Sequence, residues 1–349
     1  MSDNKIIYNN LGESGLKIAP IILGCMTYGL KNWADWVIDD EEEVFLILKR
    51  AYDVGLRTFD AADVYSNGKS EELVGKFLKK YNIPRNRVVI LTKLFFVIDE
   101  EDKNFNMAKA LAAPKYEYEN AQGLSRKHVL EAAENSVKRL GTYPDVTQIH
   151  RLDRSTPKKE IMKALNDIVE QGLTRYIGAS SMKAYEFAEL QFIADKNGWH
   201  TFISMQNYYN LLYREEEREM NPFCQNSTLG KVGLIPWSPI ARGILAKPLG
   251  LQTSRSLSDK TMIRLGLTNL SEADQEIVNR VEKLSNKLGY SMSAVATAWV
   301  ISKGANPIVG LNSVKRVDDI LTALEIKLTD EDIKYLEEPY VPKVPSGLL

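Results

Sequence analysis

The chain has little of what several classes of protein require. Among its 349 residues are only two cysteines and three histidines. Cys25 and Cys224 are too few for a disulfide framework, and no metal-type spacing links them. We therefore expect a reducing compartment and no bound metal.

An excess of charge and long apolar runs are also missing. The 45 Lys and Arg residues nearly balance the 46 Asp and Glu residues, so the net charge is −1. Nucleic acid or an anionic membrane would require a basic excess. No apolar run approaches the ~20 residues of a membrane span, and the polar start, MSDNKIIYNN, lacks the apolar core of a secretory signal. We expect a soluble, cytoplasmic protein, monomeric or weakly self-associating, whose partner is a small molecule.

Short apolar runs alternate with amphipathic segments along the chain. A hairpin is predicted at 6–20, with Gly-Glu-Ser-Gly at its turn. Eight strands follow, at 20–24, 56–60, 87–93, 145–150, 173–180, 201–206, 232–239 and 306–312. Each precedes a predicted helix, and these lie at 40–55, 69–81, 125–141, 156–172, 183–198, 221–230, 291–304 and, as the last, 314–325. Ser70, Ser125 and Thr156 are expected to cap three of them.

The repeated strand–helix unit indicates a parallel sheet, and strands that are apolar throughout have both faces buried. Eight such units over about 300 residues fit a closed (β/α)8 barrel in a single domain, 1–349. The alternative is an open doubly wound sheet, which usually carries a G-x-G-x-x-G loop after its first strand. Here that strand ends in GCMTYG, which lacks the spacing, so the barrel is favoured.

Two long loops interrupt the repeat, at about 95–123 and 241–270. Loops of this length in a compact domain are usually functional. Both follow the C-terminal end of a strand, which is where the active sites of barrels lie.

Polar and aromatic residues follow most of the predicted strands. In chain order they are Asp60 with Tyr65, Lys93, His150, Ser180 with Ser181, Gln206, and Trp237 with Ser238. Each has a structural alternative, such as a helix cap for Asp60 or packing under a loop for Tyr65. In a closed barrel, however, these positions converge on one end.

A lysine and a buried acid beside a phenol have a definite chemical effect. The cation of Lys93 is expected to lower the pKa of Tyr65, and the Asp60 carboxylate balances the lysine. A neutral His150 can donate a hydrogen bond to a substrate oxygen. Such a site can protonate the oxyanion that forms on a carbonyl receiving hydride. A carboxylate-pair hydrolase is less well supported, because Asp60 is the one acid firmly placed at this end.

Several stretches, taken in order, resemble the aldo-keto reductase family over nearly the whole chain. They are LGESGLKIAPIILGCMTYG, FDAADVYSNGKSEELVG, ILTK, QIHRLD, YIGASS, MQNYYN, PWSPIARGIL and PIVGLNSVKRVDDI. The second resembles the family's D-T-A-x-x-Y-G-x-x-E signature, and the set is most like the fungal aryl-alcohol dehydrogenase-like branch. The chain departs from the pattern at Ala61, where Thr is common, at Ser66, where Gly is common, and at Ile320, where Asn often contacts adenine.

The resemblance implies a catalytic tetrad of Asp60, Tyr65, Lys93 and His150, with Tyr65 as the general acid in carbonyl reduction. It also implies NADP(H) as the hydride donor, with no metal. Its implied cofactor-binding residues are Gly24, Cys25, Met26, Asp60, Ser180, Ser181, Gln206, Trp237, Ser238, Pro239, Ile240, Arg242, Gly243, Lys247, Arg255, Gly310, Asn312, Arg316 and Asp319. Arg316 lies in the first turn of the last predicted helix and suits a 2′-phosphate.

Six further residues on the same loops are expected to line the substrate site: Tyr28, Trp33, Phe95, Phe96, Arg151 and Tyr209. Most are aromatic, which favours aryl or extended aliphatic aldehydes and ketones over small charged ones. A second reading remains open, in which the chain is a cofactor-sensing binding subunit of the same fold with little catalysis.

Overall fold

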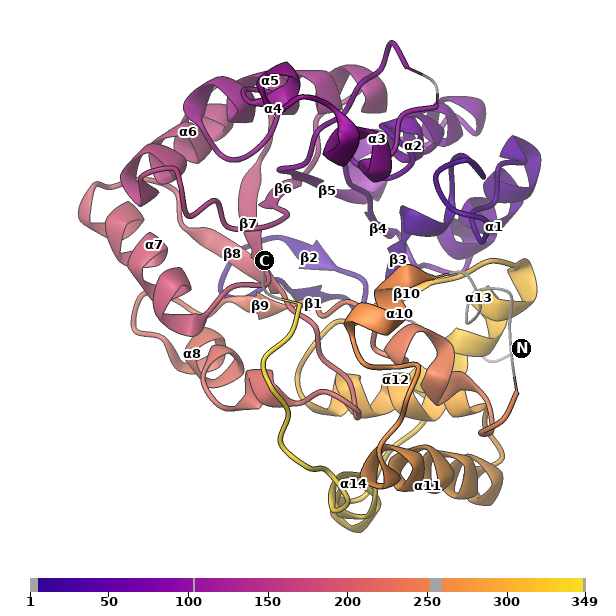
Figure 1. Ribbon diagram of the computed structural model, residues 1–349. Coiled ribbons are helices and arrows are strands. Elements are labelled where there is room, and N and C mark those ends of the chain that lie inside the picture. The colour runs from indigo at the N-terminus through magenta and orange to yellow at the C-terminus, as the bar shows by residue number, and fades with distance from the viewer. Residues whose placement is uncertain (1–5, 103, 252–258, 348–349) are drawn as a thin grey trace.

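The computed structural model describes residues 6–102, 104–251 and 259–347. Eight parallel strands form a central ring with helices around it (Figure 1). Neighbours in the ring follow the order of the chain, apart from the pairing of the last strand with the first. The eight strands are β3 (Ile22–Gly24), β4 (Thr58–Asp60), β5 (Val89–Leu94), β6 (Val146–Ile149), β7 (Tyr176–Ser180), β8 (Phe202–Gln206), β9 (Gly233–Leu234) and β10 (Ile308–Gly310).

The ring is closed between β9 and β10. The backbone amides of Asn306 and Ile308 donate to the carbonyls of Leu234 and Pro236, each at 2.9 Å. Trp237 and Ile308 add a parallel bridge. The predicted (β/α)8 barrel is therefore confirmed, and the alternative of an open doubly wound sheet is wrong.

Helices follow the strands on the outside of the barrel. The principal ones are α1 (Glu41–Asp53), α2 (Lys69–Lys80), α5 (Arg126–Leu140), α6 (Lys158–Glu170), α7 (Ala184–Lys196), α8 (Met220–Asn226), α11 (Glu272–Leu288), α12 (Met292–Ser302), α13 (Val314–Leu321) and α14 (Asp330–Glu337). In the described part of the chain, no helix is long and apolar enough to cross a membrane.

Two of the three predicted helix caps are wrong. Ser125 does cap α5 by accepting from the amide of His128. The N-cap of α2 is Gly68, and Ser70 instead donates to the carbonyl of Cys25 at 2.8 Å. The N-cap of α6 is Pro157, and the hydroxyl of Thr156 instead donates to Asp153.

Five of the helices in the described ranges lie outside the predicted repeat. Three are short and fall in the two long loops: α3 (Met107–Ala112), α4 (Lys115–Tyr118) and α10 (Lys260–Arg264). The others, α11 and α14, begin with capping boxes at Ser271 and Thr329. The helix predicted as the last is therefore followed by another. A search for one helix after each strand does not predict α11 and α14, because no strand directly precedes either of them.

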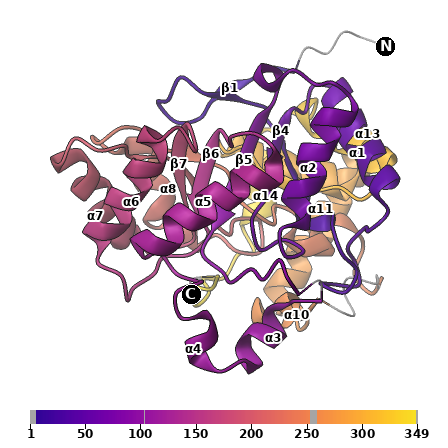
Figure 2. The same cartoon turned by 90° about the horizontal axis from the view of Figure 1, so that it is seen from above.

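The two ends of the barrel differ. Strands β1 (Asn9–Asn10) and β2 (Lys17–Ile18) form the predicted antiparallel hairpin, and Leu11 and Ile18 pack against the starts of barrel strands. Figure 2 shows this hairpin at one end of the molecule and α3, α4 and α10 at the opposite end. The C-terminal ends of the strands therefore open toward the long loops.

Close packing of α2 against α5 depends on a glycine. A Cβ at Gly75 would lie 2.4 Å from the carbonyl oxygen of Leu140. We predict that Gly75→Ala lowers the free energy of unfolding by about 1–3 kcal/mol through overpacking, although alanine is the better helix former. Gly15→Ala is the control, because a Cβ there meets nothing within 4 Å. Denaturant midpoints measure both, and an unchanged midpoint for Gly75→Ala would contradict this view of the contact.

Candidate active site

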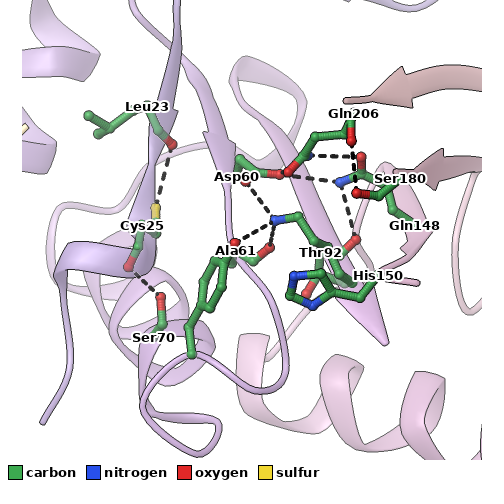
Figure 3. Close-up of polar contacts among 12 residues, drawn as sticks. Leu23, Cys25, Asp60, Ala61, Ser70, Thr92, Gln148, His150, Ser180 and Gln206 are labelled. Carbon is green, nitrogen blue, oxygen red and sulfur yellow. Dashed lines mark hydrogen bonds and ion pairs between the residues drawn. The ribbon is translucent and has the colours of Figure 1, made fainter. Parts of the chain in front are cut away.

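Lys93 is the centre of a buried polar group inside the barrel. Its ammonium donates to Oδ2 of Asp60 at 2.6 Å, to the carbonyl of Ala61 at 2.8 Å and to the hydroxyl of Tyr65 at 3.1 Å (Figure 3). The side chain of Lys93 is completely buried, and that of Asp60 is 2% exposed. All three donor positions of the ammonium are therefore used, and the tyrosine hydroxyl is held by one of them.

The charges of this group shift one another's pKa values. Burial alone would lower the pKa of Lys93, but Asp60 and Tyr65 hold it above its ordinary value. Burial raises the pKa of Tyr65, and the cation of Lys93 only partly offsets this effect. The expectation of a lowered tyrosine pKa is therefore wrong for the protein alone, because the cost of desolvating a phenolate exceeds the attraction of one cation. Near neutral pH Tyr65 is a phenol that can donate a proton.

His150 lies beside the tyrosine. The ring centroids of Tyr65 and His150 are 5.8 Å apart with an interplanar angle of 84°. Burial, with the charges of Arg151 and Lys93, holds the pKa of His150 well below its ordinary range. Its Nδ1 is buried and has no hydrogen-bond partner among the described residues. A neutral imidazole with an unsatisfied ring nitrogen suits an oxygen ligand.

Asp60 is held by two glutamines as well as by the lysine. Its Oδ1 accepts from Nε2 of Gln148 at 3.2 Å and from Nε2 of Gln206 at 3.0 Å. The two side chains are also bonded to each other, Gln206 Nε2 to Gln148 Oε1, at 3.0 Å (Figure 3). The sequence argument missed Gln148. Its signal was available, since Gln148 precedes His150 by two positions, which places both on one face of the predicted strand 145–150.

The loop that carries Tyr65 has an unusual backbone. Ser66, Asn67 and Gly68 have φ values of 50°, 52° and 86°, so three consecutive residues are left-handed. The left-handed φ of Ser66 explains why glycine is common at this position in the family that the sequence resembles. A specific contact stabilises Ser66 in this conformation: its Oγ accepts a hydrogen bond from the amide of Leu30 at 3.0 Å.

Buried charges support this loop from α2 and α5. The guanidinium of Arg139 bonds to Glu71 at 2.6 Å, and the hydroxyl of Thr92, next to Lys93, donates to the same carboxylate at 2.5 Å. Asp63 is also buried, and burial with the neighbouring Glu71 raises its pKa well above its usual range. These contacts connect the tyrosine loop to the strand that carries the lysine.

On the other side of the barrel, Ser180, Ser181, Gln206 and Trp237 lie together as predicted. Ser180 donates to the carbonyl of Gln206 at 2.8 Å, and the indole of Trp237 donates to Oγ of Ser181 at 3.1 Å. Tyr208 stacks on Trp237, with centroids 4.5 Å apart and an interplanar angle of 23°. The indole is therefore fixed in orientation by two neighbours.

The segment after β9 folds as a tight irregular turn, η4 (Ala241–Ala246), and contains Gly243. Ser238 and Arg242 have φ values of 56° and 55°, so the backbone is left-handed at both. Pro239 and Ile240 lie between them. The guanidinium of Arg242 is ion-paired with Asp259.

Lys247 has a buried Nζ with no hydrogen-bond partner in the part of the chain that the structure describes. An unsatisfied buried ammonium after a turn of this kind fits a pyrophosphate. The predicted contact at Arg255 lies outside the described residues.

The remaining predicted cofactor residues lie at the ends of β3 and β10. Gly24 and Cys25 are buried and Met26 is half-buried, whereas Gly310, Asn312 and Arg316 are exposed. Ser313 caps α13 by accepting from the amide of Arg316.

Asp319, further along α13, is engaged within the protein. Its carboxylate accepts from Ser291 at 2.8 Å and from Ser293 at 3.0 Å. Its neighbour Ile320 is buried in the core.

Of the six residues expected around the substrate, the structure brings four close to the tetrad and places two in the core. The ring of Trp33 meets Tyr65 at 6.3 Å, Phe96 meets His150 at 5.1 Å, Phe95 packs on Phe96, and Arg151 adjoins His150 in the chain. Tyr28 is buried, with its hydroxyl on the carbonyl of Leu311 at 2.6 Å. Tyr209 is also buried and bonds to Glu217. The last two are packing residues, because each hydroxyl is already satisfied away from Tyr65.

The C-terminal segment also reaches this end of the barrel, which the sequence argument did not foresee. Tyr213 accepts from the amide of Ser346 at 2.9 Å. A Cβ at Gly347 would lie 3.3 Å from Cζ2 of Trp237. Figure 1 shows the yellow C-terminal segment of the described chain running from α14 toward the ring of strands. The end of the described chain is thus a neighbour of the proposed cofactor site.

Within the described residues, no group of three or more His, Cys, Asp or Glu side chains could hold a metal ion. The arrangement instead combines a cation, a phenol and a neutral imidazole.

Comparison with known proteins gives consistent matches. Residues 20–340 match the sequence profile of the Aldo/keto reductase family. A provisionally named aryl-alcohol dehydrogenase of Saccharomyces cerevisiae is 57% identical over 336 residues, which cover 95% of this chain and 96% of that protein. A versiconal hemiacetal acetate reductase of Aspergillus parasiticus is 56% identical over 338 residues, which cover 96% of this chain and 97% of that protein. A provisionally named aryl-alcohol dehydrogenase of Schizosaccharomyces pombe is 54% identical over 348 residues, which cover 98% and 97%.

The buried ion pair predicts a pH-dependent loss of stability in Asp60→Asn. In this variant Lys93 has no counter-charge, and we expect the free energy of unfolding near neutral pH to fall by about 3–5 kcal/mol. Burial would then lower the lysine pKa below its ordinary 10.5. Between the lowered pKa of the folded variant and 10.5, the unfolded chain would bind more protons than the folded chain. The loss of stability relative to the wild type should therefore shrink as the pH rises toward 10.5.

The control is Asp318→Asn, which breaks the exposed pair with Arg50 and should cost about 0–1 kcal/mol. Denaturant unfolding at several pH values measures both variants. A deficit for Asp60→Asn that is small, or that does not change with pH, would show that Lys93 does not depend on this carboxylate.

Proposed function

Because this chain belongs to the aldo/keto reductase family, we propose that it reduces aldehydes and ketones to alcohols with NADPH, and that Tyr65 donates the proton. The observation that carries the proposal is the contact of Lys93 with both Tyr65 and Asp60. The family membership makes the chain an oxidoreductase that acts on carbonyl compounds. The coenzyme and the proton donor are the specific parts of the proposal.

The residues around the tetrad suit a nicotinamide dinucleotide. Trp237 offers an oriented indole for stacking, and Ser180, Ser181 and Gln206 offer polar groups for a carboxamide. Lys247 has a buried ammonium without a hydrogen-bond partner among the described residues, which suits the pyrophosphate. Arg316, exposed at the start of α13, suits a 2′-phosphate. When bound there, NADPH would supply the hydride.

The chain's own residues then perform the proton chemistry. Tyr65 and His150 donate hydrogen bonds to the carbonyl oxygen, which orients and polarises it. As negative charge develops on that oxygen, the proton moves from the hydroxyl of Tyr65. The ammonium of Lys93 stabilises the phenolate that remains, and Asp60 keeps the lysine charged and in place.

The preferred substrates are aryl or extended aliphatic carbonyl compounds. Trp33, Phe95 and Phe96 provide apolar surface near Tyr65 and His150, and aromatic rings of this kind stack on flat ligands. Two similar proteins are provisionally named aryl-alcohol dehydrogenases, and a third is named as a reductase of versiconal hemiacetal acetate. Those names are consistent with extended, ring-containing substrates.

The alternative of a cofactor-sensing subunit with little catalysis is less well supported. Such a protein does not need a proton donor, yet Tyr65, Lys93 and Asp60 form a complete hydrogen-bonded group. Oxidation of NADPH on mixing with an aromatic aldehyde separates the two functions, because only the enzyme consumes the coenzyme.

Removing the proton donor tests the mechanism. We predict that Tyr65→Phe lowers kcat for an aromatic aldehyde by roughly a hundredfold or more, the contribution usual for a positioned general acid. NADPH binding, followed by the change in tryptophan fluorescence, should be unchanged. Tyr28→Phe is the control and should retain turnover, because its hydroxyl bonds within the core. Near-normal turnover in Tyr65→Phe would contradict the assignment.

Coenzyme choice tests Arg316. We predict that Arg316→Ala raises the KM for NADPH by about tenfold or more, because a charge-assisted contact to a phosphate is lost. The KM for NADH should change little, since NADH has no 2′-phosphate. Lys315→Ala, an exposed neighbour on the same helix, serves as the control. Equal effects of Arg316→Ala on both coenzymes would assign the arginine another role.

A further inference from the structure

Arg151 is a half-buried cation beside the tetrad that the proposed proton chemistry does not use. It follows His150 at the end of β6. Its Nη1 donates to the carbonyl of His150 at 2.6 Å and lies 3.5 Å from Oγ of Ser180. Its Nε is buried and has no hydrogen-bond partner among the residues that the structure describes. The guanidinium is thus fixed on one side and unsatisfied on another.

No acidic side chain in the described ranges pairs with Arg151. Two other arginines near this end of the barrel, Arg139 and Arg242, are paired with Glu71 and Asp259. Removing part of a guanidinium from water without supplying a counter-charge is costly. Burial accordingly lowers the pKa of Arg151 to about 10. An anionic ligand would remove this cost.

The position of Arg151 limits where such an anion can lie. Its charge acts on both Tyr65 and His150 and favours the ionised tyrosine and the neutral histidine. It is therefore within electrostatic range of the two side chains that would hold the reacting carbonyl. Its planar fork of donors matches a carboxylate, which can accept two parallel hydrogen bonds.

We infer that Arg151 is a specificity-determining residue that favours carbonyl substrates with a carboxylate a few bonds from the reacting carbonyl. This inference rests on the proposed carbonyl reduction. On an aromatic aldehyde, a carboxylate in the ortho position would reach Arg151 while the aldehyde meets Tyr65 and His150. A carboxylate in the para position would point away from the reacting group and could not do both. The aromatic residues then select the ring, and the arginine selects the substituent.

The test compares two isomers of equal charge, 2-formylbenzoate and 4-formylbenzoate, reduced with NADPH. In Arg151→Met we expect kcat/KM for the ortho isomer to fall by about tenfold or more relative to that for the para isomer. Arg151→Lys should give an intermediate ratio of the two values, because it keeps the charge but loses the fork. The ratio is independent of the fraction of folded enzyme, so a partly unfolded variant remains informative.

Arg154→Met is the matched control. Arg154 lies three residues further along the same loop, but its side chain is 42% exposed and paired with Glu186. It should change neither isomer.

Four results would overturn the inference. Equal losses for both isomers would assign Arg151 a general effect on Tyr65, which a shifted pH profile of reduction would also reveal. A weakened affinity for NADPH in Arg151→Met would assign the residue to the coenzyme. Wild-type turnover of 4-nitrobenzaldehyde without preference for the ortho acid would refute the inference and leave the proposed function intact. Absence of turnover with every aldehyde would refute both.

Discussion

The ion pair between Lys93 and Asp60 is the interaction on which the arrangement of the site depends. Both side chains are buried inside the barrel, where an unpaired charge would be very unfavourable. The second oxygen of Asp60 is held by Gln148 and Gln206. One buried charge therefore ties together β4, β5, β6 and β8, and the hydroxyl of Tyr65 is placed by the last free donor of the lysine.

The same pair connects structure with chemistry. A lysine in an apolar interior would lose its proton, and a phenol there would not ionise readily. Asp60 raises the pKa of Lys93 and so keeps the lysine charged. The retained cation partly offsets the rise that burial causes in the pKa of Tyr65. The protein alone therefore keeps Tyr65 protonated. The carboxylate is best understood as the group that keeps the lysine charged, and not as a second acid in the reaction.

The sequence allowed much of the fold and the tetrad to be predicted, for physical reasons. Buried parallel strands are apolar on both faces, so their positions are visible as short apolar runs. Their C-terminal ends meet at one end of the barrel, so Asp60, Lys93 and His150 could be grouped without knowing any contact. The structure brings these residues together around Lys93, as the grouping required.

Other features could not be predicted from local patterns. Tyr28 and Tyr209 lie in loops near strand ends, and only the packing around them shows that they belong to the core. The direction of the pKa shift of Tyr65 depends on the balance between burial and charge, and this balance is set by the three-dimensional positions of the surrounding side chains. The approach of the C-terminal segment to Trp237 joins residues far apart in the chain.

The closure of the barrel has a consequence for how the chain folds. The first barrel strand, β3, pairs with the last, β10, and β10 also completes the ring through its bonds to Leu234 and Pro236. One edge of the sheet therefore stays unpaired during synthesis until residues near the C-terminus leave the ribosome. Contacts of such high contact order form slowly, and an exposed strand edge can pair with another chain. The residues of the proposed tetrad lie on or just after the early strands β4, β5 and β6, so this part of the barrel can assemble first. The stage most exposed to aggregation lasts until Ile308 is in place.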